Sequence, residues 1–242
     1  MVSRKKNEEI TAPKVFLSYS SEDAMLAGRL KRSLEHYGVR AFLAHEDIIP
    51  GKKWTNEIMN ELKSCDIFVP ILTTRSKGSV YVNQEIGFVL AGKAKIIPLR
   101  IDVDPFGFIS ETQGMKPITT TVRTQDGWSQ EIDSNSSAWL IVGKIMQDAQ
   151  LRDALKRSVV YDMHNSRSFE ETRSKTRVLE CFSEFGQNEV RELASAATSN
   201  RQIFEEEYKG KKFLRLFFEN HRRYLTDDLA LNLTLKGFLE SE

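Results

Sequence analysis

Three side chains with hydroxyl groups, Ser18, Tyr19 and Ser20, follow the apolar residues "VFL" near the start of the chain. An amphipathic pattern begins soon after them, so the segment predicts a buried strand that passes into a helix. Ligands of open α/β sheets bind at the carboxyl ends of the strands. Hydroxyl groups at this turn could therefore bond ribose or phosphate oxygens. An equally simple interpretation is a capping box formed by Ser20 and Asp23.

Known phosphate-binding motifs are incomplete at this and the following strand ends. The first turn, "SYSSED", lacks the glycines of a dinucleotide-binding fingerprint. The sequence Gly51-Lys52-Lys53 lacks the final Ser or Thr of a P-loop. The apolar run "DIFVPIL" ends without the aspartate of a response-regulator receiver. The sequence disfavours all three classes of protein.

Apolar runs alternate with helical patterns through the first two thirds of the chain. Strands are expected in "VFLSY", "VRAFLA", "DIFVPIL" and "KIIPLRI", and "ITTTV" is a further strand-like run. Helices are expected between them, with one face carrying Met25, Leu26, Leu30 and Leu34, another Trp54, Ile58 and Leu62, and a third Val82, Ile86, Val89 and Leu90. Gly38 should end the first of these helices. The pattern predicts a parallel sheet covered by helices on both faces.

The remainder of the chain is helical in pattern and rich in aromatic residues. A long helix is expected in "SSAWLIVGKIMQDAQLRDAL", and everything after residue 161 reads as helix. The segment "TDDLALNLTLKGFL" fits a strand or a helix, and its start favours a helix. We expect a leader over residues 1–12, a sheet domain over 13–160 and a small helical domain over 166–242 that regulates the first or binds a partner.

Composition describes an ordinary globular protein without a global electrostatic signal. The 242 residues carry a formal net charge of +1, which gives no case for binding nucleic acid or an anionic membrane. The N-terminus predicts no signal peptide and no segment reaches the length of a membrane span, so a cytoplasmic protein is expected. The two cysteines and the residues His45 and Glu46 lack metal-ligand spacing, and no metal site is expected.

Five sequence blocks together resemble the TIR (Toll/interleukin-1 receptor) domain, most closely in its bacterial form. They are "VFLSYSSED", "AFLAHEDIIPGKKW", "SCDIFVPILTTRS", "SVYVNQEIGFVLAGK" and "KIIPLRID", in this order, and the resemblance covers about residues 13–155. It implies a flavodoxin-like five-stranded parallel sheet. It also implies that "HEDIIPGKK" is a loop used in self-association, with Ile48, Ile49, Pro50 and Gly51 as assembly residues.

Many members of this family cleave NAD+ between nicotinamide and ribose, and the resemblance implies the same activity here. It places the catalytic glutamate at Glu85, with NAD+ as substrate and no cofactor. Tyr81 stands where related enzymes carry a Trp, one helical turn before Glu85. The predicted substrate contacts are Ser18, Tyr19, Ser20, Phe42, His45 and Tyr81, although Phe42 also fits a core position.

Two other functions remain open at this stage. The chain fits a TIR adaptor without enzymatic activity, which signals by contacts between TIR domains. It also fits a TIR module that binds a nucleotide as a sensor without cleaving it. The presence of a glutamate at position 85 favours the enzyme, with a role in immune or anti-phage signalling.

Overall fold

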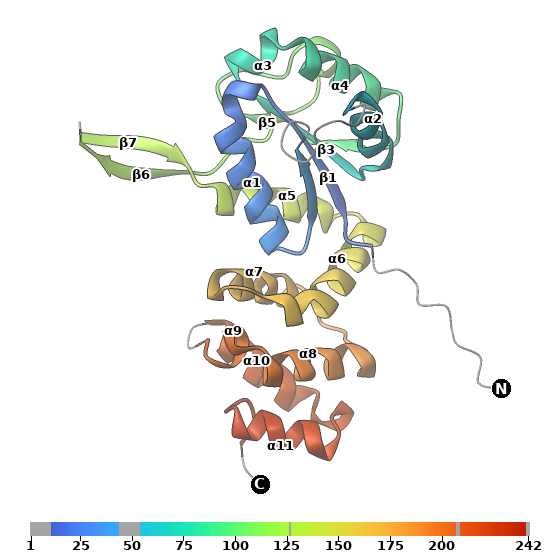
Figure 1. Ribbon diagram of the computed structural model, residues 1–242, viewed down its shortest axis with the longest axis vertical. Helices are drawn as coiled ribbons and strands as arrows, with labels where there is room; N and C mark the ends of the chain where they lie inside the picture. Colours follow the sequence, from blue (N-terminus) through green and yellow to red (C-terminus); the bar gives the residue numbers. More distant parts are fainter. Residues whose placement is uncertain (1–10, 44–53, 126, 207–208, 241–242) are drawn as a thin grey trace, which may run out of the picture. The chain divides into compact units, whose positions relative to one another are not determined.

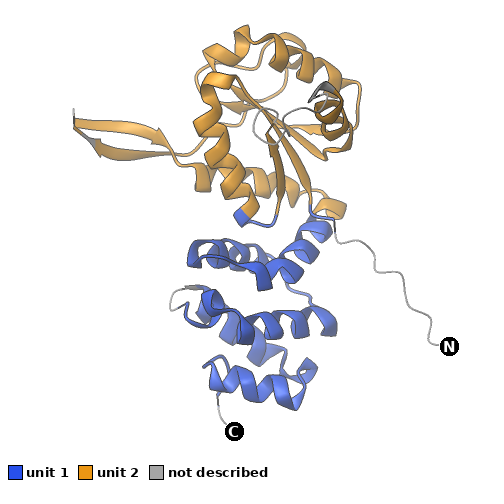
Figure 2. Cartoon of the chain, in the orientation of Figure 1, with its two compact units in different colours: residues 1–12, 36–38, 152–242 blue, residues 13–35, 39–151 orange. Residues whose placement is uncertain are grey.

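The computed structural model describes residues 11–43, 54–125, 127–206 and 209–240. The chain divides into two compact units (Figure 2). Residues 13–35 and 39–151 form the first, which we call the sheet unit, and residues 1–12, 36–38 and 152–242 form the second, the helical unit. The domain limits expected from the sequence, 160 and 166, stay a prediction.

A parallel sheet forms the centre of the sheet unit (Figure 1). Its strands are β1 (Lys14–Ser18), β2 (Arg40–Leu43), β3 (Ile67–Leu72), β4 (Lys95–Ile96) and β5 (Leu99–Arg100). The order is β2-β1-β3-β4, and β5 also pairs with β3. The strand order reverses between β1 and β3, as in flavodoxin-like sheets, so the expected fold class is confirmed.

Pro98 explains why the fourth predicted strand becomes two short ones. β4 pairs with Ile67 and Phe68 at the start of β3, whereas β5 pairs with Ile71 and Leu72 at its end. Proline has no amide hydrogen for the ladder, so the strand is interrupted at this position. The strand-like run "ITTTV" does not join this sheet. It lies in β6 (Thr119–Thr124), which pairs antiparallel with β7 (Gly127–Ile132).

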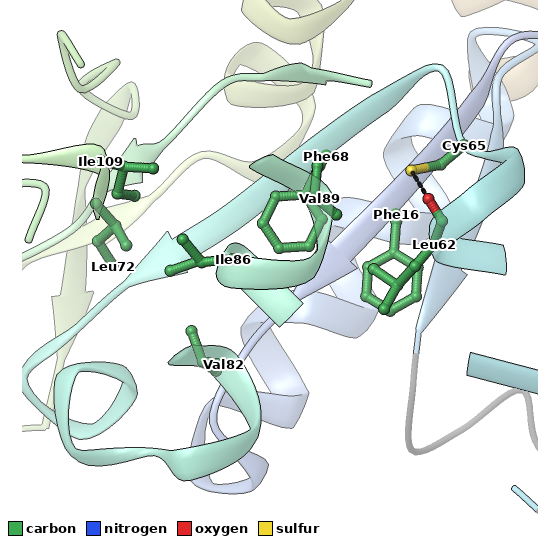
Figure 3. Close-up of a cluster of buried hydrophobic side chains, with 9 residues drawn as sticks. All are labelled: Phe16, Leu62, Cys65, Phe68, Leu72, Val82, Ile86, Val89 and Ile109. Carbon is green, nitrogen blue, oxygen red and sulfur yellow. Dashed lines mark hydrogen bonds between the residues drawn. The ribbon is translucent and has the colours of Figure 1, made fainter. Parts of the chain in front are cut away.

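Helices cover both faces of the sheet. A buried cluster joins β1 and β3 to α2 (Trp54–Ser64) and α4 (Val80–Leu90), and Figure 3 shows it around Phe16 and Phe68. The rings of Phe16 and Phe68 lie 5.8 Å apart. Figure 1 shows α1 (Ala24–His36) and α5 (Ser134–Ile145) on the opposite face. Every residue of β3 is buried, which confirms the central strand expected from its apolar run.

Two residues assigned to inward helix faces are exposed. Met25 of α1 is 76% exposed and Leu90 of α4 is 45% exposed. Residues of an α-helix advance by about 100° each, so Met25 lies about 200° from the buried Ala27, on the far side of α1. Leu90 follows the last buried position of its stripe, Val89, by one such step. Met25 was therefore assigned to the wrong face, whereas Leu90 lies about 40° from Ile86, at the edge of the buried stripe, and is the last residue of α4.

The predicted capping box at Ser20 and Asp23 is also wrong. The segment Ser21–Asp23 forms a 3₁₀ turn before α1, and the Ser20 hydroxyl caps no amide. The Asp23 amide bonds the Ser20 backbone carbonyl at 2.7 Å. The Asp23 carboxylate instead accepts hydrogen bonds from Thr73 and Arg75, which follow β3.

The long helix expected from "SSAWLIVGKIMQDAQLRDAL" is two helices, α5 and α6 (Ala149–Asp162). The Asp148 carboxylate accepts the amides of Gln150 and Leu151, at 3.0 and 3.1 Å. A carboxylate in this position caps the start of a helix. Asp148 therefore begins a new helix within a segment whose apolar pattern runs on without a break.

The helical unit confirms the helical pattern of the second part of the chain. After α6 come the helices α7 (Phe169–Leu179), α8 (Gln187–Ser199), α9 (Arg201–Phe204), α10 (Lys209–Asn220) and α11 (Asp227–Leu235), with short 3₁₀ turns at Met163–Asn165 and Arg222–Tyr224. The ambiguous last segment is helical and begins at the Thr226 cap. Phe185 and Phe217 form an edge-to-face pair in its core, with ring centres 4.8 Å apart.

Gly38, just after α1, has a left-handed backbone conformation that is strained for residues with a side chain. Its φ angle is +80°, and a Cβ atom there would lie 2.5 Å from Cγ2 of Val159. The left-handed conformation and this close approach both require glycine. The Gly38 carbonyl also accepts a hydrogen bond from Ser158 at 2.9 Å.

The hairpin of β6 and β7 extends away from the rest of the sheet unit (Figure 1). Most of its described side chains are exposed, and Trp128 is 73% exposed. The Asp133 amide donates a hydrogen bond to the Ile118 carbonyl at 2.9 Å and closes the base of the hairpin.

We expect that replacing residues 119–132 with a short Gly/Ser linker changes the melting temperature by less than about 2 °C, because little buried surface is lost. Thermal melting followed by circular dichroism measures this, and a fall above about 5 °C contradicts it.

Candidate functional site

Glu85 is a carboxylate on the buried side of α4. The helix begins at the Ser79 cap, and its inward stripe consists of Val82, Ile86 and Val89. Glu85 lies three residues after Val82 and four before Val89, so helical geometry places it beside this stripe. Its exposed fraction is 8%. Ionisable side chains are seldom this deeply buried without a partner.

The partner of Glu85 is Ser18, the last residue of β1. The Ser18 hydroxyl donates a hydrogen bond to Oε2 of Glu85 at 2.5 Å, across 67 residues of sequence. Ser18 is fully buried and pairs with Pro70 of β3 in the sheet. The bond thus joins the end of β1 to the middle of α4.

Burial raises the pKa of Glu85 from 4.5 to about 7. The cause is the loss of water around the charged form, and the Ser18 hydrogen bond offsets part of this effect. A carboxyl group with this pKa exchanges its proton near neutral pH. Perturbed carboxyl groups of this kind cluster at functional sites.

A pocket of about 240 Å³ opens beside Glu85, between α2 and α4. Its walls are mainly apolar, and its lining residues are Ile58, Met59, Leu62, Tyr81, Gln84, Glu85 and Phe88. Tyr81 is 52% exposed. The described part of the pocket is smaller than typical sites for drug-sized ligands, and matches a single ring system. It can place one aromatic ring or sugar next to a carboxylate.

The turn after β1 is tied to the loop after β3. Oδ2 of Asp23 accepts the Thr73 hydroxyl at 2.6 Å, and Oδ1 accepts the Arg75 guanidinium at 2.7 Å. Arg75 also lies 3.2 Å from a carboxylate oxygen of Glu22. These contacts hold together the carboxyl ends of the two strands at which the sheet order reverses. No local pattern in the sequence predicted this link, because its partners are about fifty residues apart.

The structure brings some of the predicted site residues together. Tyr81 and Glu85 line the same pocket, and Ser18 contacts Glu85. Tyr19 and Ser20 are buried in the turn after β1 and are not among the pocket residues. Phe42 is half-buried and its ring lies 5.3 Å from that of Phe16, in the core.

Five other predicted site residues lie outside the described residues: His45, Ile48, Ile49, Pro50 and Gly51. The structure adds Met59, Gln84 and Phe88 to the pocket. The last two could have been found from the helical period, because residues 81, 84, 85 and 88 share one face of α4.

In the part of the chain that the structure describes, no group of three or more His, Cys, Asp or Glu side chains is arranged to hold a metal ion. Among the same residues, no helix combines the length and apolar character that a membrane crossing requires.

Comparison with known families gives a match to the TIR domain over residues 15–135, half of the chain. The chain belongs to the TIR domain family. This agrees with the resemblance carried by its sequence blocks and with the parallel sheet. The matched residues include Ser18, Tyr81 and Glu85, so the pocket lies within the TIR domain. Comparison with curated proteins gave no match.

Two solved structures similar to this chain are TIR domains. The TIR domain of the Toll-related receptor TRR-2 from Hydra magnipapillata is 17% identical, with 42% of this chain and 82% of that chain covered and a TM-score of 0.39. The TIR domains of the activated Roq1 resistosome, which directly recognises the pathogen effector XopQ, are 18% identical, with 70% and 99% covered and a TM-score of 0.37.

Proposed function

We propose that this TIR protein is an NAD+ glycohydrolase that uses Glu85 as its catalytic residue. One observation carries the proposal: Glu85 is a buried carboxylate, held by Ser18, in the wall of a pocket that it shares with Tyr81. A solvated helix carboxylate would have no such partner and no such pocket. The position of Glu85 in the motif "SVYVNQE" agrees with the family resemblance.

The reaction needs few catalytic groups. Nicotinamide is a cation while it is attached to ribose, so it leaves as a neutral molecule when the bond electrons pass to its ring nitrogen. The ribose carbon that remains has oxocarbenium character, and a nearby carboxylate stabilises that developing positive charge. Glycosidases face a poorer leaving group and use two carboxylates for the same bond type. The single carboxylate of Glu85 meets the smaller requirement.

The apolar walls of the pocket support the same chemistry. Ile58, Met59 and Phe88 lower the local dielectric, which strengthens the interaction between Glu85 and a cationic transition state. Tyr81 offers an aromatic face that can stack on the nicotinamide ring. The attacking group is a water molecule, which gives ADP-ribose, or the adenine of the same molecule, which gives a cyclic product. In either case a new bond forms at the ribose carbon and a proton passes to solvent.

The proposal includes activation by self-association and a role in immune or anti-phage signalling. The predicted assembly residues Ile48, Ile49, Pro50 and Gly51 lie outside the described residues. The helical unit is a candidate for contacts with a partner protein. Leu216 of α10 is 59% exposed, whereas Phe217 and Phe218 of the same helix are buried. A cytoplasmic location stays part of the same proposal.

The decisive experiment is incubation of the purified full chain with NAD+ at several protein concentrations. Chromatography resolves nicotinamide from linear and cyclic ADP-ribose. We expect nicotinamide release whose rate per molecule rises with protein concentration. Absence of release from nanomolar to high micromolar protein, with the oligomer present, would favour the TIR adaptor instead. NAD+ that is bound but not cleaved would favour a nucleotide sensor.

The pKa of Glu85 gives the proposed reaction a specific pH dependence. The active form is the carboxylate, so kcat/KM should rise with pH and level off above about 7. Below this value the rate should fall about tenfold for each pH unit, because the group is protonated. An ordinary glutamate with a pKa of about 4.3 would give a flat profile between pH 5 and 9. Measured initial rates across this range, with stability checked at each pH, decide between the two.

A further inference from the structure

We propose that Ser18 is a positioning residue for Glu85, which fixes one carboxylate oxygen and favours the ionised side chain, so that the other oxygen faces the substrate. The inference rests on the proposed function and assigns Ser18 a different role from a direct substrate contact. The hydrogen bond between the two side chains is the observation that carries it. The bond is 2.5 Å long and lies in the interior of the sheet unit.

Strand pairing and burial fix the position of Ser18. It ends β1, which pairs with β2 on one side and β3 on the other. The residue before it, Leu17, is in register with both Leu43 and Val69. Ser18 itself has no exposed surface. A donor on such a rigid element can hold a partner to within the small tolerance that catalysis requires.

The carboxylate of Glu85 has an unequal environment at its two oxygens. Among the described residues, the hydrogen bond that Glu85 receives comes from Ser18 and ends on Oε2. The carboxyl group also lines the pocket. We therefore assign Oε1 to the pocket side, where it can face a positively charged ribose carbon. The single hydroxyl proton of Ser18 is used in this bond and is not available to a ligand.

Among the described residues, few other groups near Glu85 could control its charge. The pocket residues from α2 are Ile58, Met59 and Leu62, none of which ionises, and α4 contributes Tyr81 and Gln84. Ser18 is the contribution of β1. In an apolar site a hydrogen bond to the charged form is stronger than in water. Loss of the Ser18 hydroxyl should therefore raise the pKa of Glu85 further, because only the burial effect would remain.

The test compares Ser18→Ala with Ser18→Cys, and uses Ser33→Ala as a control. Alanine removes the donor and leaves a small gap, whereas cysteine has a similar shape and a weaker donor. Ser33 is a buried serine of α1 in the same unit. The pKa of Glu85 is measured by NMR titration of carboxyl-labelled glutamate in the full chain. Its signal is assigned by its loss in Glu85→Gln.

We expect Ser18→Ala to raise the pKa of Glu85 by about one to two pH units, since hydrogen bonds to charged groups contribute about that much. The kcat/KM profile should move by the same amount, with a loss of about five- to fifty-fold at pH 7 that recovers as pH rises. Ser18→Cys should fall between Ala and the wild type. Ser33→Ala should leave both quantities unchanged.

Three results separate the inference from the function on which it rests. A pKa of Glu85 that stays at its wild-type value in Ser18→Ala and Ser18→Cys overturns the positioning role, even if turnover falls. A rate lowered equally at all pH values contradicts it as well. If the wild type releases no nicotinamide while the pKa still moves, the hydrogen bond acts as inferred and the proposed function is wrong.

Discussion

Glu85→Gln should reduce nicotinamide release from NAD+ by more than about a hundredfold. Removal of one group that stabilises charge in a transition state costs about 3 kcal/mol or more in barrier height. Glutamine has nearly the same shape and can still accept the Ser18 hydrogen bond, so the pocket should keep its form. The measurement compares the initial rates of the wild type and Glu85→Gln at pH 8, where wild-type Glu85 is mostly ionised.

Stability provides an internal control for this variant. The pKa of Glu85 is about 7 in the folded protein and 4.5 is its ordinary value, so the folded state binds the proton more tightly. Ionisation of this buried group therefore reduces stability progressively as pH rises from about 4.5 to about 7. Glu85→Gln should be more stable than the wild type by up to about 3 kcal/mol at pH 8, with the difference vanishing near pH 4.

An inactive Glu85→Gln protein that is also less stable at pH 8 would point to lost structure instead of lost chemistry. Wild-type turnover by the variant would exclude Glu85 as the catalytic residue. Tyr81→Phe is a matched comparison, because it keeps the aromatic face beside Glu85 and removes only the hydroxyl. It should retain most of the activity if Tyr81 acts by stacking.

Lys175→Met should lower the stability of the helical unit by about 3 kcal/mol, the scale for breaking a buried ion pair. The Lys175 side chain is fully buried. Its ammonium group lies 2.8 Å from carboxylate oxygens of both Asp162 and Glu171. It also donates to the Asp162 carbonyl at 2.8 Å and the Ser166 hydroxyl at 3.3 Å. Methionine fills the space but leaves these acceptors without their donor.

The matched control is Arg201→Met in the same unit. Arg201 also pairs with a carboxylate, that of Glu205 at 2.7 Å, but its side chain is 76% exposed. Exposed pairs of this kind contribute little, so the melting temperature should not change. Thermal unfolding followed by helical circular dichroism should show a fall of about 10 °C for Lys175→Met alone. Equal effects of the two substitutions would contradict the structural role of Lys175.

Local patterns in the sequence determined the class of the fold. The unbroken apolar run of β3 required a strand covered on both faces, and β3 is fully buried. The alternation of strands and helices required parallel pairing, which the sheet order confirms. The N-cap residue Thr226 favoured a helix in the last segment, where the structure has α11. These signals are local because periodicity and caps depend on neighbouring residues.

The sequence also placed Tyr81 and Glu85 on one face of one helix, since one turn separates them. It did not determine that this face borders a pocket, nor that Ser18 would be the partner of Glu85. That hydrogen bond joins residues 67 positions apart and forms only when β1 and α4 pack in the folded sheet unit. Such contacts depend on the packing of whole elements, which local propensity does not encode.

The contacts of Lys175 and Asp23 also depend on the packing of whole elements. No sequence pattern indicated that Lys175 is buried, because its partners Asp162, at the end of α6, and Ser166, just after the following turn, lie on other elements. Asp23 reads as part of a helix cap, yet the loop after β3 offers it a hydroxyl and a guanidinium. The sequence determined the elements of this TIR protein and the candidate residue Glu85. The tertiary structure decided which polar groups are buried, because only packed elements exclude water and bring distant partners within hydrogen-bond distance.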